Sequence, residues 1–284
     1  MSERLAAYWA LTKPGITGLV MLTTGAGVAL AARDAMDIAL LAYTLIGTGF
    51  VVAGTNALNQ WWERDADARM HRTRRRPLPA GRLEPGAALV FALGISTAGL
   101  VWLGTLVNGL TTLLAALSLV IYVGVYTPLK RRTSLALFVG AVPGALPILG
   151  GWTAAGAGLT NAAWVLFAIL FLWQLPHFLA LGWLYREDYR RGGFAMLSRH
   201  DADGRLTGRQ ASLFSLALLV ASLLPASVDL ASSAYVMGAI ALGTVLLAWS
   251  AMLWRAPTAA GARRLFLASI VYLPGLLLLL IATP

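Results

Sequence analysis

The chain has 284 residues, of which 58% are hydrophobic and only 12% are charged, and its mean hydropathy is +0.73. The charged share is about half that of an ordinary soluble domain, which excludes a soluble fold and indicates a polytopic membrane protein. The chain has no cysteine, so disulfides, thiolate metal sites and a cysteine nucleophile are excluded as well.

Nine apolar stretches follow one another along the chain. Each is close to the ~20 residues that a helix needs to cross about 30 Å of hydrocarbon. Backbone hydrogen bonds must close inside each stretch, so only helices are expected there. The predicted fold is therefore an all-α, polytopic membrane helical bundle with spans at roughly 15–31, 38–58, 86–106, 110–127, 134–155, 162–185, 211–228, 234–254 and 265–283.

The basic residues predict the orientation. All but one of the 22 lysines and arginines lie in the N-terminal segment or in the loops after the second, fourth, sixth and eighth spans, and the exception is Arg33. The positive-inside rule then predicts a cytoplasmic N-terminus. The net charge of +10 is a topology signal, so no nucleic-acid partner is needed to explain it.

Acidic residues gather in two of these loops, after the second and the sixth span. The two loops are four spans apart, and four spans preserve orientation. We therefore expect one transmembrane domain, residues 1–284, built as a parallel repeat of four-helix units at about 15–133 and 134–254 with a ninth helix appended.

A polar stripe is predicted where the second span ends. Asn59, Glu63 and Asp67 are spaced four residues apart. On a continuing helix each would be offset from the last by about 40° and about 6 Å, whereas Asp65 would point the other way. Oxygens in such a row suit Mg²⁺, which binds through a few carboxylates together with substrate phosphate oxygens.

Arginines follow the stripe directly, at Arg72, Arg74, Arg75 and Arg76. Guanidinium groups bind phosphate and diphosphate in bidentate fashion, so acid, metal and base together would form a diphosphate site. The alternative is a helix end with i,i+4 ion pairs and arginines that set topology. Spacing alone leaves both interpretations open.

The second acidic cluster holds Glu187 and Asp188, with Arg186, Arg190 and Arg191 beside them. Because both clusters are expected on one side of the membrane, we predict a shared metal pocket of Glu63, Asp67, Glu187 and Asp188. Lys130, in "YTPLKRRT", is a third feature on that side, and its alternative role is a positive-inside anchor.

Several motifs resemble the UbiA superfamily of intramembrane prenyltransferases, and within it the heme O synthase (protoheme IX farnesyltransferase) family. The resemblance covers nearly the whole chain. It is carried by "LTKPGITGLV", "NQWWERDADARMHRTRRRPLPAGR", "YTPLKRRT", "GAVPGALPILGGW", "WQLPHFLALGWLYREDY" and "GGFAML". The chain departs from the superfamily pattern where Glu63 replaces an aspartate and Arg75 an asparagine.

The resemblance implies transfer of a farnesyl group from farnesyl diphosphate to a vinyl group of heme B, with Mg²⁺ as cofactor. The products would be heme O, for terminal oxidases, and diphosphate, made at the cytoplasmic face. It also implies that the protein is embedded in the lipid bilayer, and it is compatible with a heme A synthase as downstream partner. The expected catalytic residues are Asn59, Glu63, Asp67 and Lys130, the diphosphate contacts are Arg72, Arg76, Lys130 and Arg186, and the heme contacts are His177, Trp173 and Tyr189.

His177 is the only histidine inside a predicted span, and it follows Pro176, which is expected to kink the helix. Polar groups at membrane depth are usually functional. Three roles stay open: a contact to heme iron or propionate, a hydrogen bond to the backbone freed at the kink, and proton transfer. The small residues of the fifth span, among them Gly140, Gly150 and Gly151, suit either close helix packing or room for a macrocycle.

Two rival functions remain on sequence grounds. Prenylation of a quinone precursor or another aromatic acceptor would use the same diphosphate site. A small-molecule transporter is disfavoured, because the acids gather at one surface instead of following a path through the bilayer.

Overall fold

The computed structural model describes residues 3–283, and within that range it is helical without a strand. Nine helices there are long and apolar enough to cross a membrane, which confirms the predicted fold class. The spans are α2 (Pro14–Ala32), α3 (Ile38–Asp67), α4 (Pro85–Leu106), α5 to α6 (Gly109–Leu129), α7 (Ala136–Ala154), α8 (Asn161–Leu184), α10 with η4 (Arg205–Val228), α11 (Ser233–Arg255) and α12 (Ala259–Ala282). Short helices α1 (Glu3–Leu11) and α9 (Arg186–Gly192) lie outside the spans.

The helix ends follow local chemistry. Pro14 and Pro85 stand in the first turns of α2 and α4, where a missing N–H leaves no bond unmade. The side chains of Asp37, Asn108 and Thr160 accept hydrogen bonds from the first turns of α3, α5 and α8. The N-terminal ends of these spans are therefore set by prolines and polar caps as well as by hydropathy.

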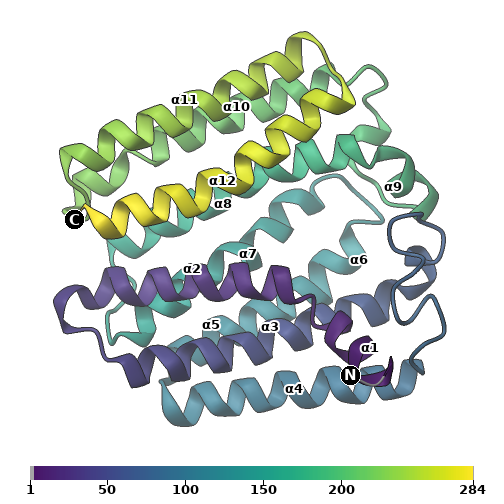
Figure 1. Ribbon diagram of the computed structural model, residues 1–284, viewed down its shortest axis with the longest axis horizontal. Coiled ribbons are helices and arrows are strands. Elements are labelled where there is room, and N and C mark those ends of the chain that lie inside the picture. The colour runs from purple at the N-terminus through teal and green to yellow at the C-terminus, as the bar shows by residue number, and fades with distance from the viewer. Residues whose placement is uncertain (1–2, 284) are drawn as a thin grey trace. The chain divides into compact units, whose positions relative to one another are not determined.

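The chain divides into two compact units. The first comprises Met1–Gly158 and Glu187–Phe194, and it contains α1 to α7 and all of α9 except Arg186. Within it α4 packs along α3, and α7 packs against α2 and α5 (Figure 1). The second unit, Leu159–Arg186 and Ala195–Pro284, packs α8 between α10 and α12, with α11 against both of those helices.

Glycine allows α2 and α7 to approach closely. A Cβ added to Gly151 would meet the backbone carbonyl of Thr24, and one added to Gly27 would meet that of Ile148. Gly140 is likewise covered by the Tyr126 ring, 2.6 Å from where its Cβ would lie. At these positions the small residues of the fifth span serve close helix packing.

The helix α8 runs unbroken from Asn161 to Leu184 although it contains Pro176. Its core-facing side chains, which include Leu166, Leu170 and Leu179, are nearly inaccessible. Tertiary packing therefore holds the helix together through the proline, as is common for prolines in membrane spans.

Candidate active site

The polar stripe lies on one continuous helix. α3 extends from Ile38 to Asp67, nine residues beyond the apolar stretch that ends at Leu58. Asn59, Glu63 and Asp67 all face inward, with exposed fractions of 2%, 3% and 0%. Asp65, whose side chain is 81% exposed, points outward. The predicted helical offset is confirmed, and the burial shows that the stripe is not a solvated helix face.

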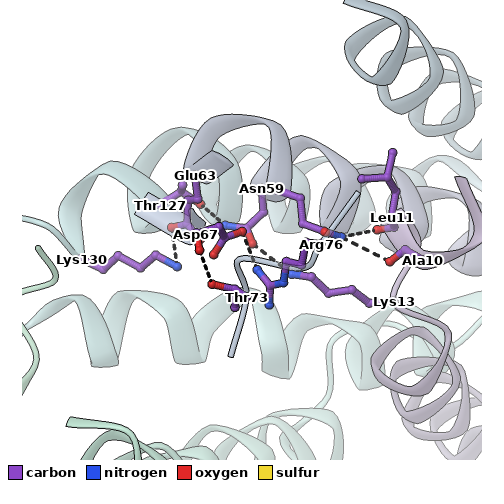
Figure 2. A network of polar contacts seen from close by, with 11 residues as sticks. Ala10, Leu11, Lys13, Asn59, Glu63, Asp67, Thr73, Arg76, Thr127 and Lys130 are labelled. Carbon is purple, nitrogen blue, oxygen red and sulfur yellow. Dashed lines mark hydrogen bonds and ion pairs between the residues drawn. The ribbon is translucent and has the colours of Figure 1, made fainter. Parts of the chain in front are cut away.

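Each buried carboxylate of the stripe has its own cation. The Lys130 Nζ lies 2.5 Å from Glu63 Oε1, and the Arg76 Nη1 lies 2.7 Å from Asp67 Oδ2 (Figure 2). The hydroxyl of Thr73 donates to the Asp67 carbonyl at 2.9 Å and so ties the arginine loop to the helix end. Buried charges are stable only when paired in this way.

A third cation, Lys13, completes the row, and sequence reasoning gave it only a topological role. Its Nζ donates to Asn59 Oδ1 at 3.1 Å, while Asn59 Nδ2 donates to Thr127 Oγ1 at 3.2 Å (Figure 2). Lys13 has a left-handed backbone, with φ 46° and ψ 67°, a conformation that costs a non-glycine residue about 1–3 kcal/mol. The adjoining turn is held on α3 by Gln60, whose Nε2 donates to the Leu11 carbonyl at 2.8 Å.

The two lysines differ in their electrostatics. Burial, and after it the positive charge of Arg76, lowers the pKa of Lys13 to about 7. Burial also acts to lower the pKa of Lys130, but the Glu63 carboxylate together with Tyr122 and Tyr189 outweighs burial, so the pKa of Lys130 is raised. Lys130 is therefore a permanent cation, whereas Lys13 changes charge near neutral pH.

A π-helical turn, η2 (Ile121–Tyr126), positions Lys130. It leads into the short α6 (Thr127–Leu129), after which the Lys130 Nζ lies 5.1 Å from the Tyr126 ring and 4.9 Å from the Phe194 ring. Turns of this kind occur often at functional sites. They carry no hydropathy signal, so the sequence did not reveal it.

The stripe fits a hard cation. Asp67 Oδ1 is fully buried and has no hydrogen-bond partner, and Glu63 Oε1 has only its ion pair with Lys130. An orphaned carboxylate oxygen is costly unless something else binds it. Glu63 and Asp67 would therefore hold Mg²⁺ together with phosphate oxygens of a substrate.

The second acidic cluster lies against the first loop. Asp188 accepts hydrogen bonds from the backbone N–H groups of His71 and Arg72, at 3.1 and 3.0 Å. Glu187 instead pairs with Arg190 at 2.9 Å, with both side chains more than half exposed. Across residues 3–283 no three His, Asp or Glu side chains form a group that could hold a metal ion. A metal-binding role for Glu187 and Asp188 stays a prediction.

The expected diphosphate contacts fall in different places. Arg76 belongs to the buried row, while the exposed Arg72 has its guanidinium 6.0 Å from the Tyr189 ring. Arg186 belongs to the second unit, where it donates to the Trp183 carbonyl at 3.1 Å and lies 4.5 Å from that ring. Its diphosphate contact therefore stays a prediction.

The expected heme contacts are divided as well. Tyr189 lies in the first unit, edge-on to Phe194. His177 and Trp173 lie one turn apart on α8 in the second unit, with ring centroids 5.1 Å apart. The His177 Nδ1 lies 2.8 Å from Ser269 Oγ, a side chain and not the backbone freed by Pro176.

The sequence is similar to those of known prenyltransferases. Residues 20–273 match the UbiA prenyltransferase family. A protoheme IX farnesyltransferase from Solibacter usitatus is 45% identical, over 96% of this chain and 97% of its own. Another from Salinibacter ruber is 42% identical, over the same shares of the two chains.

Solved structures support the fold. A structure of a digeranylgeranylglyceryl phosphate synthase matches with a TM-score of 0.81 at 18% identity, covering 99% of this chain and 98% of that one. A UbiA homologue from Archaeoglobus fulgidus, bound to GPP and Mg²⁺, matches with a TM-score of 0.64 at 13% identity, covering 98% and 100%. By sequence and by fold, this chain belongs to the UbiA prenyltransferase family.

Proposed function

We propose that this protein transfers a farnesyl group from farnesyl diphosphate to a vinyl group of heme B, giving heme O and diphosphate. The carbon–oxygen bond to the diphosphate breaks, and its electron pair leaves with the diphosphate. The vinyl group then supplies the electrons for the new carbon–carbon bond. Water adds to the resulting cation as a hydroxyl group and releases one proton.

The observation that carries the proposal is the buried row of Asn59, Glu63 and Asp67 faced by three cations. Lys130, Arg76 and Lys13 are already in place before any bond breaks, which is what stabilisation of a departing anion requires. Relatives at 45% and 42% identity over nearly the whole chain support farnesyl transfer to heme as the reaction.

In the mechanism Glu63 and Asp67 would hold Mg²⁺, which would supply positive charge to the diphosphate oxygens. Arg76 and Lys130 would then bind phosphate oxygens in place of the carboxylates. Lys13, which contacts Asn59, would also donate to the diphosphate. Arg72 and Arg186 are proposed as further diphosphate contacts, and Glu187 and Asp188 as further metal ligands. Tyr122 and Tyr126, with ring centroids 5.1 Å apart beside Lys130, offer aromatic faces to an allylic cation.

We further propose that the site opens to the cytoplasm. The loops that carry the acids also carry most of the arginines, and basic loops stay inside. The relatives come from bacteria, so the expected location is the inner membrane, with a heme A synthase as downstream partner.

The test is a product assay with two acceptors. Purified protein receives farnesyl diphosphate and Mg²⁺ with equal amounts of heme B and a quinone precursor, and products are resolved by mass. We expect a product with the mass of heme B plus one farnesyl group and one hydroxyl group. A prenylated quinone precursor would mean that the acceptor is a quinone precursor and not heme. If no metal-dependent product formed, the transporter interpretation would be favoured instead.

A further inference from the structure

His177, in the second unit, makes contacts that the diphosphate site does not use. This residue is half-buried on α8, and its ring lies among aromatic side chains. Trp173 stacks on it at 5.1 Å and an interplanar angle of 27°, and Phe266 of α12 lies at 4.8 Å and 34°. Phe178 meets the ring edge-on at 5.3 Å. These neighbours restrict the ring to one plane.

Ser269 determines which ring nitrogen carries the proton. Its Oγ lies 2.6 Å from the Phe266 carbonyl and 2.8 Å from His177 Nδ1. A hydroxyl group has one hydrogen. The carbonyl can only accept, so that hydrogen lies on the line to Phe266, and the hydroxyl oxygen must accept from Nδ1–H. The opposite arrangement would leave two oxygens 2.6 Å apart with no hydrogen between them.

The neutral imidazole therefore has its proton on Nδ1 and its lone pair on Nε2. No hydrogen bond reaches Nε2 from the part of the chain that the structure describes. The same segment of α12 is held by a second bond, because the Trp173 indole N–H donates to the Ser269 carbonyl at 2.6 Å. Contacts from α8 and α12 thus fix the direction of the Nε2 lone pair, and no described residue donates a hydrogen bond to it.

We propose that His177 binds the iron of the acceptor heme through Nε2, and that Ser269 is the positioning residue that sets this tautomer. The proposal rests on the proposed function, because heme is the acceptor there. A neutral imidazole is a common ligand for iron, and ligating histidines usually donate their other N–H to an oxygen that orients the ring. A ring hydrogen bond to Ser269 also makes Nε2 a more basic ligand.

The arrangement decides among the three roles that sequence left open. A hydrogen bond to the backbone freed by Pro176 would occupy Nδ1, but that nitrogen donates to a side chain of another helix. Proton transfer would need a path of exchangeable groups. The rings that pack against His177 are those of Trp173, Phe178 and Phe266, and they do not form such a path. An iron ligand needs only an aimed lone pair and a ring that cannot turn.

The test is resonance Raman spectroscopy of ferrous heme B bound to the purified full-length protein without farnesyl diphosphate. We expect an iron–histidine stretching band that His177→Gly removes and that added imidazole restores. Ser269→Ala should lower the frequency of the band and weaken heme affinity about 10-fold, the size expected when a ligand loses its orienting partner. Ser269→Thr, which keeps the hydroxyl, should resemble the parent protein.

Ser250→Ala is the matched control. Ser250 is also buried, its Oγ donates to the carbonyl four residues earlier at 3.0 Å, and it lies 2.8 Å from a second side chain, Ser215. We expect a similar loss of stability and an unchanged band. An unchanged band in His177→Gly or in Ser269→Ala would overturn the proposal.

Heme O formation, measured on the same samples, separates this proposal from the proposed function. Heme O made by a parent protein that lacks the band would reject His177 as ligand and keep the function. The band without any prenylated heme would keep His177 and reject the function.

Discussion

The two oxygens of Asp67 have different surroundings, and this difference bears on its role. Oδ2 is bonded to Arg76, while Oδ1 is buried without a hydrogen-bond partner. If the carboxylate only neutralised Arg76, its second oxygen would not be expected to lie buried without a hydrogen-bond partner. The orphaned oxygen is the position where a metal ion and its charge are expected.

We predict that Asp67→Asn, which keeps the shape of the side chain, lowers turnover by about 100-fold or more, the size seen when one preorganised charge contact is removed. Steady-state heme O formation measures this. The control is Asp65→Asn, two residues away on the exposed face of α3. Equal activity of the two variants would remove Asp67 from the metal site.

Lys13 predicts a pH dependence of diphosphate binding. Its pKa is about 7 in the free protein, because burial and Arg76 disfavour the charged form. A bound diphosphate favours the charged form and raises that pKa, so binding takes up a proton above pH 7. Affinity should therefore fall as pH rises from about 7 to about 9, and it should change little from this group below 7.

Isothermal titration calorimetry of farnesyl diphosphate in buffers of different ionisation enthalpy reports this proton uptake directly. Lys13→Arg keeps a cation that stays charged throughout the range, and it should bind without the uptake. The same uptake in Lys13→Arg and in the parent protein would assign the proton to another group.

At the residue scale, spacing predicted what one helix brings together. Asn59, Glu63 and Asp67 follow from the 3.6-residue period once α3 is taken to continue past Leu58. The place of Lys13 in the site could not be predicted in this way, because its contact with Asn59 spans 46 positions and depends on a left-handed turn before Pro14. The string "LTKPGITGLV" contained the only signal, a lysine that precedes an apolar span directly.

At the element scale, the packing of α2 on α7 positions the turn that carries Lys13. The contact is close because glycines stand on both helices, Gly27 on α2 and Gly151 on α7. We predict that Gly151→Ala lowers stability by about 1–3 kcal/mol, as overpacking of a tight interface does. Thermal unfolding in detergent measures it.

The adjacent Gly150→Ala is the control, because its added Cβ would meet only a Thr111 methyl group, 4.0 Å away. We expect it to keep the parent melting temperature. A Gly151→Ala variant as stable as Gly150→Ala would mean that α2 and α7 can separate without loss.

Hydropathy predicted the positions of all nine spans but not the exact ends of each helix. α3 continues nine residues beyond its apolar stretch, and α10 begins at Arg205, six residues before the expected start at 211. These polar extensions are helical because they are held by neighbours, not because they are apolar. The π-helical turn at Ile121–Tyr126 was not predicted either, because its apolar residues do not differ in hydropathy from the rest of the span.

At the scale of the whole molecule, the two compact units do not follow the expected division of the chain. The first unit extends to Gly158 and takes in Glu187–Phe194, whereas the proposed repeat divides near residue 133. Units defined by packing do not test a repeat of topology, so the repeat stays a prediction. The segment Glu187–Phe194 illustrates why sequence could not divide the chain: its partners, His71 and Arg72, lie more than a hundred residues earlier.

The orientation in the membrane can be tested cleanly because the chain has no cysteine. Arg74→Cys and Asp203→Cys introduce exposed thiols in the two loops that carry the acids, and Gly158→Cys introduces one in the loop before α8. A membrane-impermeant maleimide should label the first two only in inverted vesicles and the third only in right-side-out vesicles. The reverse pattern would place the acidic site outside the cytoplasm.

The most direct test of the account is the stoichiometry of one reaction. Purified protein, heme B and farnesyl diphosphate are mixed over a series of Mg²⁺ concentrations, and heme O and released diphosphate are counted in the same samples. The account predicts equal amounts of both products, rising together with Mg²⁺ and absent after chelation. Heme O formed without Mg²⁺, or diphosphate released without heme O, would contradict it.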